Sequence, residues 1–233
     1  MMEKTESPVK ALFDRISPRY DLFNAASTFF LDSHWRRSAS RIVEKEDAKV
    51  LDLCTGTAEF ALAFSKQLNG KGRVVGVDFS KGMLKLAREK LGKRDPSKKI
   101  SLLVGNAERL SFQENTFDYV TSGFSMRNLI DLDQGLREMH RVLKPGGRAV
   151  IIEINRPTNR LTGLIYRCYL KGAIPLIGLL TVGTVSPFLY LKDSVLGFLK
   201  PEEFCGKLRA AGFREVFFKA FAPGAIGLYC ATK

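Results

Sequence analysis

The sequence predicts an α/β fold built around one seven-stranded, mostly parallel sheet. Short apolar runs alternate with segments of helical spacing along most of the chain, which favours parallel strands joined by helices on both faces of the sheet. The last two apolar runs are separated by only a short turn, so they pair antiparallel, because a parallel crossover needs about a dozen or more residues. A chain of 233 residues with 45% hydrophobic residues fits a single core, since such cores grow to roughly 250 residues.

Each element follows from its local pattern. The N-terminal part is expected to be helical, because Phe13, Ile16, Tyr20 and Phe23 recur at helical spacing. Ser80 follows a strand pattern and precedes a helical one, so we predict that it caps that helix. Further helices are predicted at 59–68, 80–91, 132–143 and 201–211, and strands at 49–54, 73–77, 100–104, 117–122, 148–154, 214–221 and 226–231.

This order of elements is typical of class I S-adenosylmethionine-dependent methyltransferases. Their Rossmann-like sheet is mostly parallel and carries an antiparallel C-terminal strand, which the plain dinucleotide-binding fold lacks. We therefore expect a single methyltransferase domain over residues 1–233. Within it, residues 1–48 are expected to form a helical N-terminal cap, and residues 155–199 an apolar insertion that covers the substrate.

Composition narrows the class of protein. The N-terminus lacks the apolar stretch of a signal peptide. The cysteines are scattered without a C-x-x-C pair, which argues against a disulfide framework and a zinc site, so we expect reduced thiols, no metal site and a cytoplasmic location. The net charge of +13 suits RNA or anionic lipid headgroups, and equally a solvated surface rich in lysine. The cysteines are Cys54, Cys168, Cys205 and Cys230.

The first strand is followed by a loop of small residues. Doubly wound sheets bind ligands beyond the carboxyl ends of their strands, where the strand order reverses. Here that region reads Asp52-Leu-Cys-Thr-Gly-Thr-Ala-Glu59, and its small side chains let the backbone approach a ligand closely. Only Gly56 is a glycine, because Cys54 and Ala58 stand where a D-x-G-x-G-x-G pattern has glycine. We expect Asp52 and Gly56 to belong to a nucleoside site.

Three further strand ends extend this expected site. Asp78 ends the second strand, where a carboxylate accepts both ribose hydroxyls of a nucleoside; the alternative is an N-cap or turn aspartate. Asn106 and Ala107 follow the third strand, where an amide reads the adenine edge and a small residue leaves room. The alternative for Asn106 is an ordinary turn. Gly123 follows the fourth strand and is expected to line the same crevice.

The main chemical rival is hydride transfer with NAD. Loops that bind NAD use a G-x-G-x-x-G run to bring the pyrophosphate against a helix N-terminus, and this loop has no such run. S-adenosylmethionine carries no phosphate, so fewer glycines suffice. The loop therefore favours S-adenosylmethionine as the cofactor.

Several motifs together resemble the UbiE/MenG family of C-methyltransferases, which act in ubiquinone and menaquinone biosynthesis. The resemblance covers nearly the whole chain. Its opening motif and its Arg-Asn pair are fairly specific, whereas Leu-Lys-Pro-Gly-Gly occurs across many methyltransferases. The motifs are Phe13-Asp-Arg-Ile-Ser-Pro-Arg-Tyr-Asp-Leu-Phe-Asn24, His34-Trp-Arg-Arg37, Phe117-Asp118, Arg127-Asn128, Arg141-Val-Leu-Lys-Pro-Gly-Gly147, Tyr190-Leu-Lys-Asp-Ser194 and Ala211-Gly-Phe213.

The resemblance implies a cofactor site and a substrate. Cofactor contacts are implied at Thr57, Asp78, Asn106 and Ala107, and at a fifth position, usually serine, which is Gly123 here. The implied reaction is methylation of a ring carbon in a prenylated quinol, with demethylmenaquinol as the favoured substrate and no nucleic-acid partner. Two alternatives stay open: a methyltransferase for RNA or a small phenol, and a non-catalytic protein that binds lipid surfaces. The oligomeric state stays undetermined.

Candidates for catalysis follow from the same resemblance. The ring carbon becomes nucleophilic when a neighbouring hydroxyl loses its proton, and a nearby cation stabilises the phenolate. Arg127 is the candidate for that cation, with a water taking the proton because arginine is always protonated. The alternative is a salt bridge from Arg127 to Asp118 or Asp131. Asn128 is expected to position the ring or a water, and Tyr20 and His34 are weaker candidates for the general base.

Residues 172–191 contain no charged side chain. The segment is long enough to cross a bilayer, but Pro175, Gly178, Gly183 and Pro187 are expected to break such a helix. We interpret it as an apolar lid or tunnel wall for the prenyl tail that touches the inner face of the membrane; the alternative is ordinary covering of the core. Basic residues nearby are expected to rest on anionic headgroups, namely Arg156, Arg160, Arg167 and Lys171.

Overall fold

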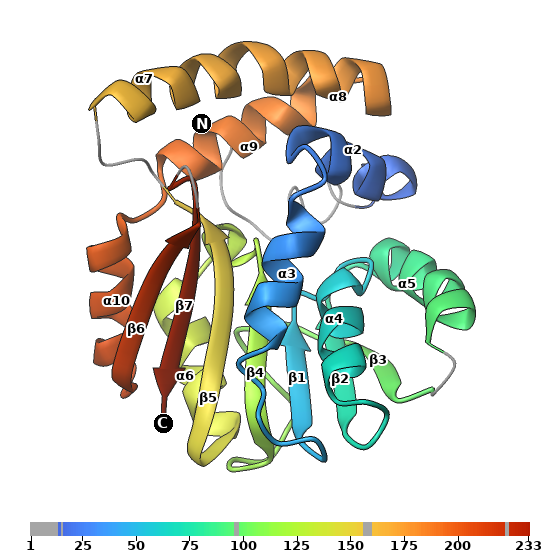
Figure 1. The fold of residues 1–233 in the computed structure, drawn as a ribbon, viewed down its shortest axis with the longest axis vertical. Helices are drawn as coiled ribbons and strands as arrows, with labels where there is room; N and C mark the ends of the chain where they lie inside the picture. The colour runs from blue at the N-terminus through green and yellow to red at the C-terminus, as the bar shows by residue number, and fades with distance from the viewer. Residues whose placement is uncertain (1–13, 15, 96–97, 156–159, 222–223) are drawn as a thin grey trace.

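The computed structural model describes residues 14, 16–95, 98–155, 160–221 and 224–233. Its strands form one sheet in the order β3-β2-β1-β4-β5-β7-β6 (Figure 1). Neighbouring strands from β3 to β5 are parallel, and β7 is antiparallel to both of its neighbours, as the sequence predicted. The strands are β1 (Lys49–Leu53), β2 (Arg73–Asp78), β3 (Ile100–Val104), β4 (Phe117–Gly123), β5 (Leu143–Ile154), β6 (Arg214–Phe221) and β7 (Ile226–Thr232).

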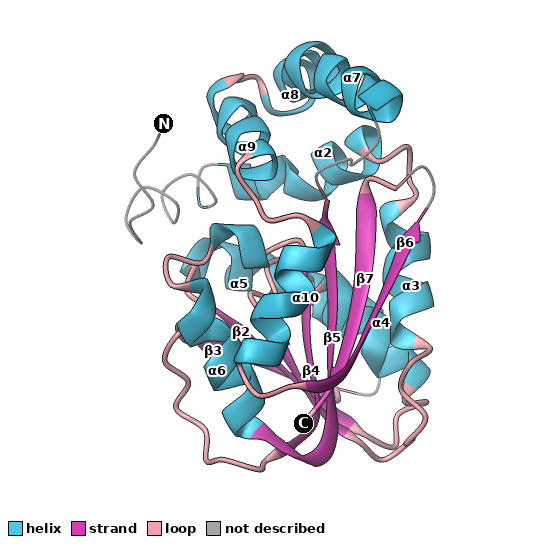
Figure 2. Ribbon diagram, turned by 90° about the vertical axis from the view of Figure 1, so that its left-hand side faces the viewer, coloured by secondary structure: helices cyan, strands magenta, loops and turns pink. Residues whose placement is uncertain are grey.

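Helices cover both faces of the sheet. Alternate residues of β1 point to opposite faces, so that Leu51 and Leu53 join one apolar cluster and Val50 joins the other. The first cluster lies under α6 and α10, and the second lies under α3 and α4, on the other side of the sheet in Figure 2. Residues of α5 also join the second cluster. These helices are α3 (Asp32–Ser40), α4 (Glu59–Gln67), α5 (Lys81–Arg94), α6 (Leu132–Val142) and α10 (Pro201–Ala210).

The predicted helix cap at Ser80 is confirmed. The Ser80 hydroxyl accepts a hydrogen bond from the backbone N–H of Met83 at 3.0 Å, which satisfies one of the donors left open at a helix start. The strand predicted at 148–154 is longer in the structure, where β5 begins at Leu143, directly after α6. Its pairing with β4 shifts register between Phe117 and Tyr119, and this irregularity accommodates the Pro-Gly-Gly stretch within the strand.

A third layer lies beyond the carboxyl ends of the parallel strands. There α2 faces α7, α8 and α9 (Figure 1), and a separate apolar cluster joins them. At its centre Phe23 of α2 packs on Phe188 of α9, with 4.1 Å between ring centroids. We call this layer the cap: α2 (Tyr20–Ser27), α7 (Arg160–Cys168), the π-turn η3 (Tyr169–Ala173), α8 (Ile174–Val182) and α9 (Ser186–Leu196).

One continuous helix runs through the cap, from Arg160 through the π-turn to Val182. Its stretch Gly163–Val182 is long and apolar enough to cross a membrane by length and composition alone. The expectation that Pro175 and Gly178 would break a helix here is wrong. Pro175 falls at the start of α8 directly after the π-turn, where the regular hydrogen-bond pattern is already interrupted. Gly183 does end the helix, in a left-handed conformation with φ of +80°.

Two short helical turns complete the description, η1 (Ser17–Arg19) before α2 and η2 (Met126–Asn128) after β4. Phe13 and Arg156, which the sequence analysis singled out, lie outside the described residues, as does the side chain of Arg160.

Candidate functional site

A crevice lies at the carboxyl ends of β1, β2, β3 and β4, where the strand order reverses. Most of the residues that the sequence predicted for the site meet there. Tyr20 reaches the crevice from the cap, and Asn128 reaches it from η2. The predicted residues that line it are Tyr20, Gly56, Asp78, Asn106, Ala107, Gly123 and Asn128, alongside Cys54, Glu108 and Phe124 among others.

The loop after β1 has an unusual backbone. Cys54, Gly56 and Ala58 all have positive φ, of 52°, 56° and 65°. The left-handed region is open to glycine but costs other residues roughly 1–2 kcal/mol each. The three positions of the D-x-G-x-G-x-G pattern therefore keep the glycine conformation although only one keeps the glycine. A Cβ added at Gly56 would meet no atom within 4 Å, so the backbone there is open to a ligand.

Asp78 joins two loops at the floor of the crevice. Its carboxylate accepts a backbone N–H from Gly56 at 2.8 Å and another from Ser80 at 2.8 Å. Only 5% of the residue is exposed, and burial raises the pKa of the carboxyl above its usual value. The turn role considered for Asp78 is therefore present, while Ser80 is the N-cap. Each oxygen retains acceptor capacity for a ligand hydroxyl.

Asn106 forms a side-chain turn, the alternative role predicted for it from the sequence. Its side-chain oxygen accepts the backbone N–H of Glu108 at 2.7 Å, which shapes the loop after β3. Ala107 is buried beside it and lines the crevice. The turn holds both residues at the crevice edge next to Asp78.

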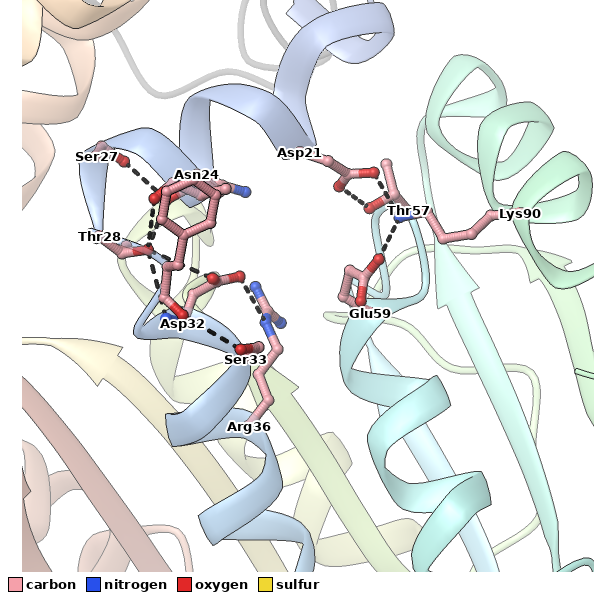
Figure 3. A network of polar contacts seen from close by, with 12 residues as sticks. Asp21, Asn24, Ser27, Thr28, Asp32, Ser33, Arg36, Thr57, Glu59 and Lys90 are labelled. Carbon is pink, nitrogen blue, oxygen red and sulfur yellow. Dashed lines mark hydrogen bonds and ion pairs between the residues drawn. The ribbon is translucent and has the colours of Figure 1, made fainter. Parts of the chain in front are cut away.

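Thr57 lies on the far side of the same loop and lines a neighbouring polar cavity. Its hydroxyl donates to Asp21 of α2 at 2.6 Å, and the other oxygen of Asp21 contacts the ammonium of Lys90 at 2.5 Å. Lys90 also pairs with Glu59 at 2.8 Å (Figure 3). A chain of polar contacts thus ties the cap to the loop after β1.

Asp52 does not line any of the four cavities described around this site. The residue is 1% exposed, and its carboxylate accepts the hydroxyls of Thr55 at 2.7 Å and Thr121 at 2.8 Å. Burial raises its pKa from 3.8 to about 6. In this structure Asp52 therefore holds the loop after β1 against β4 through these two hydrogen bonds.

Arg127 is buried and paired, but with neither acid that the sequence analysis considered. Its guanidinium contacts Glu153 of β5 at 2.8 Å, and its backbone N–H donates to the same carboxylate at 3.2 Å. Asp118 instead pairs with Lys45 and Lys144. Sequence reasoning missed Glu153, although an acid at the end of an apolar strand run signals a buried charge that needs a partner.

A second cavity adjoins the crevice. It shares Tyr20 and Phe124 with the crevice and is also lined by Arg127 and Tyr190. The hydroxyl of Tyr190, from α9, donates to the side-chain oxygen of Asn128 at 3.1 Å. The cap therefore reaches into the site at the boundary between the two cavities.

A third cavity continues from the second beneath the cap. The two share Ile154, Leu191 and Ile226 among others, and the third is lined almost entirely by apolar side chains. It measures about 380 Å³. The crevice, the second cavity and the third cavity thus form one path from the strand ends to the underside of α7.

His34 stands apart from this path. It is exposed on α3 and lines none of the four cavities described here. The structure does not bring it to the predicted catalytic residues.

Comparison with known proteins gives a consistent set of relatives. A sequence model of the ubiE/COQ5 methyltransferase family matches residues 1–233. Demethylmenaquinone methyltransferase of Lactiplantibacillus plantarum is 38% identical over 226 residues, which cover 97% of this chain and 95% of that one. The ubiquinone/menaquinone biosynthesis C-methyltransferase UbiE of Geobacter sulfurreducens is 39% identical over 234 residues, covering 100% and 91%.

Solved structures share the fold. A methyltransferase of Thermotoga maritima, described as S-adenosylmethionine-dependent and as a possible histamine N-methyltransferase, superposes with a TM-score of 0.67 at 21% identity, covering 96% of this chain and 98% of its own. The [4+2]-cyclase SpnF superposes with a TM-score of 0.70 at 16% identity, covering 97% of this chain and 95% of its own. A fold shared with a cyclase shows that the architecture alone does not fix the chemistry.

Proposed function

The chain belongs to the ubiE/COQ5 methyltransferase family, and we propose that it methylates a ring carbon of a prenylated quinol, most specifically demethylmenaquinol. It is an S-adenosylmethionine-dependent methyltransferase. The names of the relatives support the substrate, since they are demethylmenaquinone methyltransferases and C-methyltransferases of ubiquinone and menaquinone biosynthesis. The observation that carries the proposal is the path of three connected cavities, whose lining becomes steadily more apolar along its length.

The crevice fits S-adenosylmethionine better than a dinucleotide. Among the described residues that line it are two acids, Asp78 and Glu108, and no lysine or arginine. Such a lining repels a pyrophosphate and favours a ligand that carries a positive sulfonium. The open backbone at Gly56 and the acceptor capacity of Asp78 suit the adenosine part. When bound, S-adenosylmethionine supplies a strongly electrophilic methyl group.

The second cavity suits the quinol ring. Phe124 and Tyr190 offer flat apolar surfaces, and the Arg127 guanidinium, which is paired with Glu153, keeps an Nε–H without a hydrogen-bond partner. A guanidinium beside a quinol hydroxyl stabilises the phenolate and so lowers the cost of losing the proton to water. The amide oxygen of Asn128 is held by Tyr190, which directs the amide N–H groups toward a substrate oxygen or a water. These residues orient the ring and exclude water, and orientation is the main contribution such a transfer needs.

The third cavity suits the prenyl tail. Burying apolar surface contributes roughly 25 cal/mol per Å², and the lining here includes Leu170, Ile174 and Leu191 from the cap. The cap residues 160–196 therefore serve as the tunnel wall that the sequence analysis proposed for residues 172–191. Polar substitution in this wall should weaken prenylated substrates far more than tail-less analogues.

The outer face of the cap supports a contact with the membrane surface. Leu164, Leu176, Leu179 and Leu180 are each at least half exposed. The turn between α2 and α3 adds the exposed rings of Phe29 and Phe30 at the same end of the molecule. The ring of Phe29 lies 6.3 Å from that of Tyr169 in the π-turn. An apolar patch of this kind, with basic residues beside it, suits a protein that lies on an anionic bilayer and takes its substrate from it.

A methyl-transfer assay tests the proposed function. The purified protein is incubated with S-adenosylmethionine and reduced demethylmenaquinone, and the methylated product is identified by mass. Asp78→Asn provides the matched control, because it retains the shape of the side chain but loses the charge, so both cofactor affinity and turnover should fall. Turnover of a soluble phenol or an RNA, with demethylmenaquinol left unchanged, would overturn the quinol assignment and keep the methyltransferase.

A further inference from the structure

A polar cavity opens from the crevice on the side away from Asn106. It shares Tyr20, Cys54, Gly56 and Gly123 with the crevice, and its opposite wall is formed by α2 and α3. Any ligand that lies on Asp78 and extends past the β1 loop toward β4 therefore enters this cavity.

Arg36 of α3 supplies the only basic side chain among the described residues that line the cavity. Its side chain is 11% exposed, and its Nε has no hydrogen-bond partner. The nearest carboxylate oxygen, on Asp32, is 3.7 Å from Nε, beyond hydrogen-bonding distance. A buried guanidinium with an unsatisfied N–H is costly unless a ligand completes it.

Two of the three acids among the described residues that line the cavity are engaged elsewhere, whereas the third, Asp32, forms a long ion pair with Arg36 itself at 3.7 Å. Asp21 accepts the Thr57 hydroxyl and contacts Lys90, and Glu59 pairs with Lys90 and Arg94. Arg36 therefore keeps an N–H open to a ligand in this cavity, with its guanidinium between α3 and the loop that carries Thr57 (Figure 3).

The position of Arg36 is set by its apolar neighbours and by Gly123. Its guanidinium lies over the rings of Phe124 and Phe60, at 5.1 and 5.9 Å from their centroids, which holds it in place. A Cβ added at Gly123 would lie 3.1 Å from Nη1 of Arg36. Glycine at the end of β4 thus leaves room for the guanidinium directly beside the crevice.

We propose that Arg36 binds the α-carboxylate of the amino-acid arm of S-adenosylmethionine. With adenosine on the Asp78 and Asn106 side, the arm extends past Gly56 toward Gly123, where Arg36 lies. The arginine fork matches a carboxylate with two parallel hydrogen bonds. This inference rests on the proposed cofactor and adds a specificity-determining contact for it.

Calorimetric titration with two ligands tests the inference without any turnover. S-adenosylhomocysteine carries the amino-acid arm, whereas 5′-methylthioadenosine has the same adenosine and a thioether but no carboxylate. Arg36→Gln should weaken S-adenosylhomocysteine by about 10- to 100-fold, the usual effect of losing a charged hydrogen bond. It should leave the affinity for 5′-methylthioadenosine within about twofold, which also shows that the variant is folded.

Two further variants sharpen the result. Arg36→Lys keeps the charge but loses the fork, so an intermediate loss for S-adenosylhomocysteine is expected. Arg37→Gln removes the same charge from the neighbouring exposed position on α3 and should change neither affinity.

Three outcomes would overturn the inference. Equal weakening of both ligands in Arg36→Gln would mean a structural role. Unchanged affinities with a raised KM for the quinol would place Arg36 at the substrate, since it also lines the second cavity. Failure of the unmodified protein to bind S-adenosylhomocysteine would remove the cofactor assignment as well. Selective binding without methylation of demethylmenaquinol would leave the inference standing and reject only the proposed substrate.

Discussion

Individual residues of the site combine expected positions with unexpected partners. The strand ends placed Asp78, Asn106 and Gly123 together because parallel strands end at one edge of a sheet, and this followed from the sequence alone. The hydrogen-bond and ion-pair partners of the site residues did not follow from the sequence. Glu153, for example, lies 26 positions from Arg127 along the chain, and no local pattern pairs the two. Arg36 was part of a recognised motif, but its unsatisfied Nε is visible only in three dimensions.

Asp52 gives the stability a distinct dependence on pH. Burial raises its pKa in the folded state from 3.8 to about 6, so between these values the folded protein binds a proton that the unfolded chain has released. Stability therefore falls as the pH rises through this window and stays lowered above it, by about 3 kcal/mol at about 1.4 kcal/mol per unit. In Asp52→Asn this cost is absent, so its advantage over the unmodified protein should grow by about 1–2 kcal/mol between pH 5 and pH 8.

Urea unfolding at the two pH values measures this advantage. A difference between the two proteins that does not change with pH would show that Asp52 stays ionised throughout. Asp118, whose pKa is lowered and whose side chain is more exposed, serves for a comparison variant that should show no pH trend between pH 5 and pH 8, because this carboxyl is ionised in both states above its unfolded pKa.

The buried pair of Arg127 and Glu153 should be strongly coupled. Glu153 is fully buried and Arg127 is 5% exposed, so Glu153→Gln leaves an uncompensated charge and should cost about 3–5 kcal/mol. Removing both charges, in Glu153→Gln with Arg127→Met, should cost clearly less than the sum of the single changes. Unfolding free energies of the four proteins give the coupling.

An exposed pair provides the control. Lys207 and Asp133 lie 2.7 Å apart but are each more than 40% exposed, and a similar set of changes there should give a coupling of about 1 kcal/mol or less. Additive effects at Arg127 and Glu153 would contradict the pairing.

At the scale of elements, the strands were predicted well and the cap poorly. Apolar runs bounded by turns located every strand, and the one large error was the start of β5, where Pro and Gly lie within the strand. In the cap, Pro and Gly suggested broken helices. The π-turn before Pro175 and the close approach of α8 to α9 at Gly178 reverse that expectation, because packing between helices overrides local propensity.

Gly178 should resist substitution although it lies in a helix. A Cβ there would be 1.9 Å from the ring of Phe188, so Gly178→Ala should destabilise the cap by about 1–3 kcal/mol. Alanine normally improves a helix by about 0.5–1 kcal/mol. Gly172→Ala, where a Cβ meets no atom within 4 Å, should therefore be neutral or stabilising.

Limited trypsin digestion measures this difference, because the exposed Arg167 and Lys171 in the cap offer cleavage sites. Faster cleavage in Gly178→Ala than in Gly172→Ala is expected. Equal rates in both variants would show that α8 and α9 separate freely.

The whole molecule has one apolar end and a basic overall charge. The sequence indicated both, through an uncharged segment and a net charge of +13, but it could not show which leucines face outward. That depends on how α8 packs on α9, and it leaves Leu180 75% exposed and Leu176 57% exposed.

These leucines should contribute to binding of anionic vesicles. Leu180→Ser together with Leu176→Ser should weaken co-sedimentation with such vesicles by about tenfold or more, since burying one leucine contributes roughly 1.5–3 kcal/mol. Turnover of a soluble, tail-less quinol should be unchanged. Leu103→Ser, on β3 away from the cap and with 46% of the residue exposed, is the control that should leave vesicle binding intact.

The link from Thr57 through Asp21 to Lys90 joins the cap to the loop after β1. Because α2, which carries Asp21, also lines the second cavity, ligands that bind on either side of this link are expected to act as effectors of each other. If bound S-adenosylmethionine changes the affinity for the quinol by some factor, bound quinol changes the affinity for S-adenosylmethionine by the same factor. Spent cofactor that stays in place would then hold the product as well, so the hydrogen bond between Thr57 and Asp21 bears on the order in which the products leave.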